Sequence, residues 1–316
     1  MHVIDALKNA KKMLISLEIT PPNKGTSIDE LYTTLDELMP FNPAFINVTY
    51  HQPQVVYEEI DGVIHRVPKR KKPGTVGICA SIANRYNIDM VPHFSCGGFD
   101  KYETEDALID LHYLGLHNIL ALRGDPPLGY NQFIPEKGGH RFAWELVKQI
   151  TDMNRGLYIE DLEDPQPTNF CIGVAGYPEK HFESPNSEKD LLHLKKKVEQ
   201  GAHYIITQMF FDFSYYKNFV EKARDVGITV PIIPGIKPLS SVKQLHAIPR
   251  TFHVTIPNEI VDGMEAAKTP EQARKVATEK ISRLCKQLID YKVPGIHLYT
   301  MGRGRATKDL LMALNA

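Results

Sequence analysis

Short apolar runs alternate with amphipathic stretches along almost the whole chain. Several of the runs are continuously apolar, which is typical of strands buried on both faces of a parallel sheet. The alternation predicts an α/β protein, and eight strand–helix units favour a (β/α)8 TIM barrel over an open sheet. The expected strands are residues 14–20, 45–50, 90–95, 118–124, 171–177, 204–210, 231–236 and 296–301. The expected helices include residues 27–41, 104–117, 189–202, 214–227 and 269–292.

Three intervals are longer than one helix requires, and they predict extra helices and loop insertions in the barrel. We expect a long loop at 51–74, a polar loop with one helix at 125–170, and two or three helical segments at 237–295. Local signals mark two helix starts. Ser27 with Glu30 predicts a capping box, and Thr269 before Pro270 predicts an N-cap. We interpret residues 1–316 as a single catalytic barrel domain.

Composition narrows the function classes. The 37 Lys and Arg nearly balance the 38 Asp and Glu, so there is no basic excess of the kind that nucleic-acid binding requires. The N-terminus lacks a secretory pattern and no apolar run could span a membrane, so we expect a cytoplasmic protein. The four cysteines are widely spaced, without a CxxC pair, which predicts neither a disulfide framework nor a metal site.

Polar residues within the apolar runs are the candidates for chemistry, because barrel sites lie at the C-terminal ends of strands. Side-chain alternation places Glu18 opposite Leu17 and Ile19, pointing into the barrel mouth. A carboxyl group there suits a general acid, although a structural ion pair is the alternative. Arg123 and Asp125 share a face at the end of the fourth run, where they form either a site or a salt bridge.

Two further groups are ambiguous when judged from spacing alone. Gln208 shares a face with Tyr204, Ile206 and Phe210, and an amide in so apolar a run needs a hydrogen-bond partner. On the helix at 189–202 a polar row has groups suited to a ribose and a phosphate, but a solvated face is the ordinary interpretation. This row consists of Asp190, His193 and Lys197, with Lys196 beside them.

Taken together, these segments resemble the methylenetetrahydrofolate reductase family. The resemblance runs in order from residue 17 to residue 303. Its pieces are LEITPP (17–22), NVTY (47–50), PHFSC (92–96), NILALRGDPP (118–127), VAGYPEKH (174–181), DLLHLKKKVEQGA (190–202), YIITQMFFD (204–212), PIIPGIKP (231–238) and HLYTMGR (297–303).

The resemblance implies a barrel that binds FAD and uses NADH or NADPH to reduce 5,10-methylenetetrahydrofolate to 5-methyltetrahydrofolate, in one-carbon metabolism. Hydride passes through flavin N5 in a ping-pong reaction, so the cofactor carries the redox step. Glu18 matches the family's general acid, and Asp125 matches a carboxylate near the flavin and the pterin. Gln208, Gln244 and Arg303 match substrate contacts. The implied FAD contacts are Thr49, Tyr50, His93, Arg123, Gly124, Asp125, Ala143, Tyr177, His181, Asp190, His193, Lys196 and Lys197.

The resemblance also implies a homo-oligomer of the short bacterial type. The chain ends with the barrel, so we expect no C-terminal regulatory domain. The last run reads YTMGR where the family commonly has YTLNR, which affects the placement of Arg303. Two other functions stay open: a non-catalytic folate- or flavin-binding subunit of a redox complex, and a different flavin barrel that uses proline.

Overall fold

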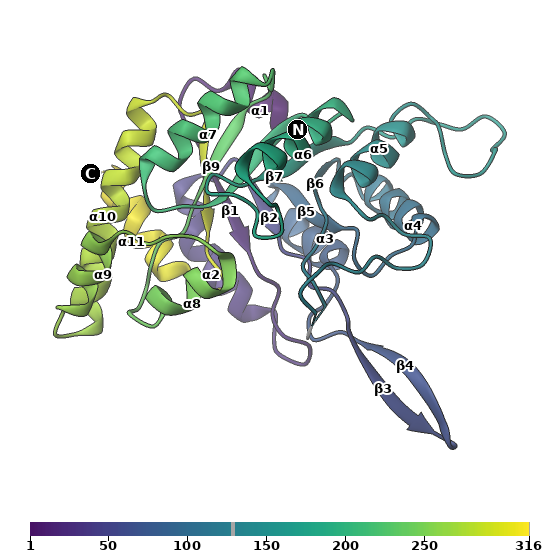
Figure 1. Ribbon diagram of the computed structural model, residues 1–316, viewed down its shortest axis with the longest axis horizontal. Helices are drawn as coiled ribbons and strands as arrows, with labels where there is room; N and C mark the ends of the chain where they lie inside the picture. Colours follow the sequence, from purple (N-terminus) through teal and green to yellow (C-terminus); the bar gives the residue numbers. More distant parts are fainter. Residues whose placement is uncertain (128–129, 316) are drawn as a thin grey trace.

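A closed barrel of eight parallel strands forms the centre of the protein, as shown in a computed structural model that describes residues 1–127 and 130–315 (Figure 1). All eight predicted strands are confirmed, and so is the (β/α)8 fold. The strands follow the order β1-β10-β9-β8-β7-β6-β5-β2, and β2 pairs with β1 to close the ring. They are β1 (Leu14–Ile19), β2 (Phe45–Val48), β5 (Asp89–Ser95), β6 (Asn118–Leu122), β7 (Cys171–Gly176), β8 (Tyr204–Met209), β9 (Ile232–Ile236) and β10 (Gly295–Tyr299).

Helices surround the barrel because each one buries an apolar stripe against the outside of the strands. The five predicted helices are present as α2 (Asp29–Leu38), α4 (Lys101–Tyr113), α6 (Ser187–Glu199), α7 (Phe213–Asp225) and α10 (Pro270–Asp290). The others are α1 (Val3–Asn9), α3 (Thr75–Tyr86), α5 (Ala143–Met153), α8 (Gln244–Phe252), α9 (Asn258–Glu265) and α11 (Gly304–Asn315), with a 3-10 turn at Met39–Phe41.

One of the two predicted helix starts is confirmed. Thr269 accepts a hydrogen bond from the Gln272 N–H, and Pro270 begins α10. The capping box at Ser27 is wrong. Its hydroxyl accepts from the Asp29 N–H at 3.0 Å, and the helix begins at Asp29 after a residue that is already helical. A capping box at Ser27 would require its hydroxyl to accept from the N–H of Glu30, three residues later, and it accepts from the N–H of Asp29 instead.

Apolar side chains fill the end of the barrel where the strands begin. Helix α1 closes that end, where the Val3 N–H donates to Asn118 Oδ1 at 2.8 Å. Only glycine fits at position 173 in this part of the barrel interior, because an added Cβ would lie 2.4 Å from the Tyr204 ring. The buried interior cluster consists of Val3, Phe45, Val91, Leu120, Cys171, Tyr204, Ile206 and Ile233.

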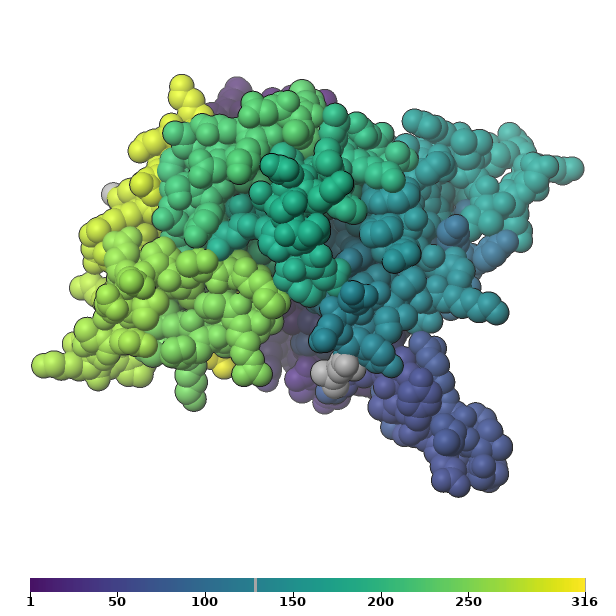
Figure 2. Space-filling view, viewed as in Figure 1, coloured from purple at the N-terminus to yellow at the C-terminus, as the bar shows by residue number. Residues whose placement is uncertain are grey.

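The segment 51–74, which we predicted to be a loop, contains a β-hairpin over residues 54–69. Strands β3 (Gln54–Ile60) and β4 (Val63–Lys69) pair in antiparallel fashion and project away from the barrel (Figures 1 and 2). Asp61 and Gly62 connect them, both with positive φ (54° and 77°), as a tight two-residue turn requires. Apolar and charged residues are mixed on both faces, so the burial signal of an ordinary strand is missing.

The described residues contain no helix that is both long and apolar enough to cross a membrane. All four cysteines are free and buried. Within the same part of the chain, no group of three or more His, Cys, Asp or Glu side chains could hold a metal ion.

Candidate active site

A large cleft of about 1640 Å³ opens at the C-terminal ends of the barrel strands. This is where barrel enzymes carry their sites. Most of the residues singled out from the sequence line it, although they come from six strands or strand ends and two helices. The predicted residues that line the cleft are Glu18, Thr49, Tyr50, His93, Arg123, Gly124, Asp125, Ala143, Tyr177, His181, Asp190, His193, Lys197 and Gln208.

Three predicted site residues lie outside the cleft lining. The Lys196 ammonium lies 3.4 Å from the centre of the Trp144 ring, on the exposed face of α6. Gln244 begins α8, where its Oε1 accepts from the Ser240 N–H at 2.6 Å. Arg303 is exposed in the turn between β10 and α11.

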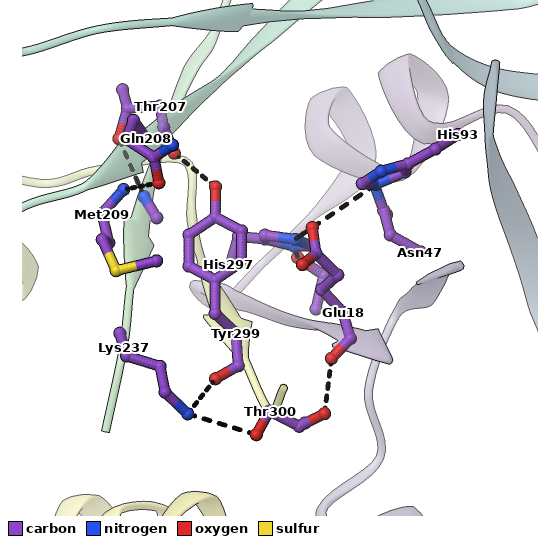
Figure 3. Close-up of polar contacts among 12 residues, drawn as sticks. Glu18, Asn47, His93, Thr207, Gln208, Met209, Lys237, His297, Tyr299 and Thr300 are labelled. Carbon is purple, nitrogen blue, oxygen red and sulfur yellow. Dashed lines mark hydrogen bonds and ion pairs between the residues drawn. The ribbon is translucent and has the colours of Figure 1, made fainter. Parts of the chain in front are cut away.

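Glu18 lies on the floor of the cleft, as the alternation along β1 predicts (Figure 3). Its Oε2 is 3.4 Å from His93 Nε2 and 3.9 Å from His297 Nε2, and its side chain is only 12% exposed. Thr300 holds the Glu18 backbone, because its N–H and its hydroxyl both donate to the Glu18 carbonyl, at 3.1 Å and 2.7 Å. The carboxyl group is therefore fixed between two imidazole rings.

The two histidines beside Glu18 have different surroundings. Burial lowers the pKa of His93 to about 4, against the attraction of the Glu18 carboxylate, so His93 is neutral at pH 7. Asn47 Nδ2 lies 3.3 Å from the same His93 Nε2. His297 Nδ1 is bonded to the Ser16 hydroxyl at 2.8 Å. Glu18, His93 and His297 thus form a polar network that the apolar barrel wall encloses.

A second layer of bonds secures the last strand next to Glu18. Lys237 donates to the carbonyls of Tyr299 and Thr300, at 3.0 Å and 3.1 Å, and burial lowers its pKa to about 8. The Tyr299 hydroxyl donates to the Thr207 carbonyl at 2.6 Å. Sequence analysis did not single out His297, Tyr299 or Lys237. The alternation rule used for β1 would have found the first two, because they occupy inward positions of β10.

The polar row on α6 faces the cleft in part. Lys197 donates to the Ala175 carbonyl, and burial lowers its pKa to about 8. Asp190 accepts from the His181 N–H at 3.1 Å and from the Ser184 hydroxyl at 2.9 Å, which fixes the loop after β7. Burial, followed by the charge of Arg123, lowers the pKa of His181 to about 4. This side of the cleft therefore combines the half-buried cations Lys197 and Arg123 with the neutral imidazole of His181.

Arg123 and Asp125 are not paired with each other as the salt-bridge alternative required. Arg123 instead forms an ion pair with Glu183, a residue that sequence analysis missed because it lies in the loop after β7. Asp125 is exposed at the lip of the cleft. Enclosure by the cleft walls raises the pKa of its carboxyl group, Arg123 opposes this, and Glu183 adds to it. Because it is exposed in the cleft lining, this carboxyl group is available for hydrogen bonding to a ligand.

The lack of a side chain at Gly124 leaves room for the side chains of Gln52 and Ser95. A Cβ on Gly124 would lie 2.2 Å from Gln52 Nε2 and 2.5 Å from Ser95 Oγ, and its φ of +95° also favours glycine. Two buried polar atoms on this flank, Gln52 Nε2 and the Tyr50 hydroxyl, have no hydrogen-bond partner in the described structure. Because such atoms cost stability when unpaired, they are candidates to bind a ligand.

Gln208 reaches the cleft, but Phe210 does not share its face as predicted. Strand β8 has an irregular register against β9 between Ile206 and Met209, and the strand ends there. Phe210 packs instead in the outer core against Tyr216, with ring centroids 5.5 Å apart. Gln208 Oε1 accepts from the Met209 N–H at 2.9 Å, which leaves its amide NH2 for other partners.

The fold and the site define a (β/α)8 barrel whose cleft is large enough for a dinucleotide-sized ligand and encloses a carboxyl group at its floor. The family model for methylenetetrahydrofolate reductase matches residues 3–315. The chain therefore belongs to the methylenetetrahydrofolate reductase family.

Similar proteins place this match in context. The chain is 31% identical over 98% of its length to a probable methylenetetrahydrofolate reductase (NADPH) of Caenorhabditis elegans, covering 43% of that protein. It is 29% identical over 92% of its length to the 5,10-methylenetetrahydrofolate reductase of Pectobacterium carotovorum subsp. carotovorum, covering 86% of that protein. The chain spans about half the length of the first curated relatives that it matches.

A solved structure agrees in fold. An uncharacterized protein from Clostridium thermocellum that binds two copies of 5-methyl-5,6,7,8-tetrahydrofolic acid has a TM-score of 0.56 and 14% identity, covering 98% of this chain and 96% of that one. At this identity the likeness concerns the barrel fold alone.

Proposed function

We propose that this chain reduces 5,10-methylenetetrahydrofolate to 5-methyltetrahydrofolate, with FAD as cofactor and NADH or NADPH as the source of electrons. The observation that carries the proposal is the Glu18 carboxyl group, enclosed on the cleft floor with His93 and His297 within 4 Å. The family match and the relatives' names support this substrate and a nicotinamide reductant.

The residues of the cleft fit FAD. Lys197 lines the cleft, and burial lowers its pKa to about 8, so an anion bound beside it would stabilise its charged form, which suits the pyrophosphate. Asp190, on the same face of the helix, suits a ribose hydroxyl. The Tyr50 hydroxyl and Gln52 Nε2 have no hydrogen-bond partner in the described structure, so both can bond to the cofactor. When bound, FAD supplies a two-electron carrier that accepts hydride from the nicotinamide and passes it to the folate.

The further proposed FAD contacts are those of the cleft walls. His193 contributes from the α6 face, and Lys196 enters the proposal through the family resemblance alone. The wall residues are Thr49, His93, Arg123, Gly124, Asp125, Ala143, Tyr177 and His181.

In the folate half of the reaction, Glu18 has the role of general acid. Its Oε2 would donate a proton to the folate amine nitrogen that leaves when the five-membered ring opens, and ring opening produces the iminium cation that accepts hydride. Neutral His93, 3.4 Å away, can share that proton through its Nε2. Ser16 fixes the orientation of His297 on the other side of the carboxyl group.

Other residues bind and orient the folate. Asp125, at the lip, can hydrogen-bond to the pterin, and a negative charge there favours the cation. The free amide NH2 of Gln208 offers a donor from the wall. Gln244 and Arg303 are proposed as folate contacts from the resemblance, with the Arg303 guanidinium suited to the glutamate carboxylate.

Stopped-flow spectroscopy of the two half-reactions tests the proposal. The purified protein, reconstituted with FAD, is mixed with NADH or NADPH, and the flavin absorbance should be bleached. Methylenetetrahydrofolate should then restore the absorbance and yield methyltetrahydrofolate. A protein that binds FAD but accepts electrons from neither nicotinamide would be a binding subunit, and reoxidation only by a proline-related substrate would also refute the proposal.

A further inference from the structure

Lys237 is a buried cation next to the candidate general acid, at the residue that follows β9. Its side chain is 3% exposed, and among the described residues no other Lys or Arg is buried. Moving a charged group out of water costs free energy unless specific interactions compensate for the lost hydration. A lysine at this position is therefore expected to have a specific role.

Two backbone carbonyl groups at the end of β10 hold the Lys237 ammonium group (Figure 3). Its Nζ donates to the Tyr299 carbonyl at 3.0 Å and to the Thr300 carbonyl at 3.1 Å. The backbone pairing of β9 with β10 stops at Ile236, opposite Leu298. Lys237 thus joins the two strands through its side chain at the point where their backbone pairing has ended.

The end of β10 also fixes Glu18. Thr300 donates its N–H and its hydroxyl to the Glu18 carbonyl, at 3.1 Å and 2.7 Å, while its own carbonyl accepts from Lys237. Tyr299 is the partner of Glu18 in the register of β10 and β1. A shift of this end of β10 would therefore move Glu18, and a misplacement of about 1 Å can lower a rate by about 10²-fold.

The charge of Lys237 acts on the Glu18 carboxyl group as well. Burial lowers the pKa of Lys237 to about 8, the Glu18 carboxylate opposes this fall, and Arg303 adds to it. The ammonium group is therefore protonated at pH 7. Attraction between two charges is mutual, and a nearby positive charge favours the ionised form of a carboxyl group. Lys237 thus helps Glu18 to release its proton.

Other titratable groups around Glu18 do not duplicate this charge. Burial lowers the pKa of His93 to about 4, and enclosure in the cleft lowers that of His51, so both rings are mainly neutral at pH 7. Burial raises the pKa of Tyr299 well above its ordinary value, so this phenol is neutral too. The side chains that face Glu18 are His51 after β2, His93 on β5, Lys237 after β9, and His297 and Tyr299 on β10.

We propose that Lys237 is a positioning residue for the folate half of the reaction. Its ammonium group holds the end of β10, and through Thr300 the backbone of Glu18, while its positive charge favours proton release from the Glu18 carboxyl group. The proton still passes from Glu18 to the folate amine nitrogen, and Lys237 neither gains nor loses one. This role rests on the proposed function, because it assists the proton transfer assigned there to Glu18.

Stopped-flow kinetics of K237M test the proposal. Met removes the charge and the N–H donors from a side chain of similar length. Flavin reoxidation by methylenetetrahydrofolate should slow roughly threefold or more on its low-pH plateau. Because the reaction needs the protonated carboxyl group, its rate falls as pH rises, and the midpoint of that fall should move up by about 0.5–1 unit. Flavin reduction by the nicotinamide should stay within about twofold of wild type.

Two further variants show whether the charge is responsible. K237R keeps a positive charge and N–H donors, so its midpoint should lie closer to wild type than that of K237M. R224M is the matched control, since Arg224 also donates to two carbonyls, those of Ile228 and Val230, but is exposed at the other end of β9. Both the plateau rate and the midpoint of R224M should equal those of wild type.

T300V tests the link between Lys237 and Glu18 even if K237M does not fold. Val has the shape of Thr but lacks the hydroxyl that donates to the Glu18 carbonyl, and the charge of Lys237 stays in place. T300V should therefore slow flavin reoxidation and leave the midpoint unchanged. A T300V rate equal to that of wild type would contradict the link through Thr300.

Infrared spectroscopy tests the charge effect without turnover. The band of the protonated Glu18 carboxyl group is identified by its loss in E18Q and followed against pH in the protein without substrate. Its midpoint should be higher in K237M than in wild type, again by about 0.5–1 unit. If wild type does not reduce methylenetetrahydrofolate, the proposed function fails, and this titration still decides whether Lys237 acts on Glu18.

Two results would overturn the role of Lys237 and leave the proposed function intact. One is a wild type that reduces methylenetetrahydrofolate while K237M matches it in rate and midpoint. The other is a slower K237M whose midpoint has not moved in either measurement, because Lys237 would then be a structural bond only.

Discussion

Replacing Glu18 by Gln removes the acidic proton while keeping the shape of the side chain. General acids contribute roughly 10²–10⁴-fold to a rate. The neighbours cannot take over, since His93 is neutral at pH 7, burial raises the pKa of Tyr299 well above its ordinary value, and Lys237 is bonded to two carbonyls. We therefore expect a loss near the upper end, about 10³–10⁴-fold in folate reduction, which corresponds to about 4–5.5 kcal/mol.

Stopped-flow measurement of each half-reaction separates this role from a general defect. E18Q should retain FAD and its reduction by the nicotinamide within a few-fold, and urea unfolding should show a stability within about 1 kcal/mol of wild type. E136Q is the matched control, because Glu136 also lines the cleft but lies outside the barrel strands. Equal losses in both half-reactions of E18Q would refute the general-acid role.

The remaining predictions concern the lip of the cleft, acid stability and packing. D125N should retain FAD but slow folate reduction about tenfold or more; unchanged folate kinetics would remove Asp125 from the site. The pKa of His93 is about 4 in the folded protein against 6.5 in the unfolded chain, so the unfolded state takes up the proton first as pH falls. The free energy of unfolding should therefore fall by about 2 kcal/mol between pH 7 and pH 5. In urea titrations, H93Q should reduce this dependence of the unfolding free energy on pH. G173A should cost about 1–3 kcal/mol because its Cβ meets the Tyr204 ring, whereas Y204F, which removes an unpaired buried hydroxyl, should be neutral or stabilising by up to about 1 kcal/mol; thermal unfolding that reversed this order would contradict the packing argument.

The hairpin shows where the prediction from sequence failed and why. Asp61-Gly62 is a strong local signal for a two-residue turn. The flanking residues do not alternate cleanly between apolar and polar, because neither face of the hairpin is buried against the barrel. The segment therefore lacks the burial periodicity of a strand, and its sequence resembles that of a loop.

In the polar row on α6, spacing correctly grouped the residues on one helical face but could not tell whether that face meets the cleft or the solvent. Asp190, His193 and Lys197 share one helical face, and spacing alone favours a solvated surface. The structure places all three along the cleft because α6 packs beside β7, while Lys196 contacts Trp144 instead. One residue of difference along the helix, a rotation of about 100°, separates the two environments.

The sequence by itself determined the eight strands, the closed barrel and the inward direction of Glu18, because alternation and strand burial are local properties with a fixed period. Only the tertiary structure brought His93 and His297 to Glu18, since these residues lie on three strands and meet where the barrel closes. It alone paired Arg123 with Glu183, a residue of the loop after β7. Contacts between residues distant in sequence depend on how the strands and loops pack in space, which no local pattern encodes.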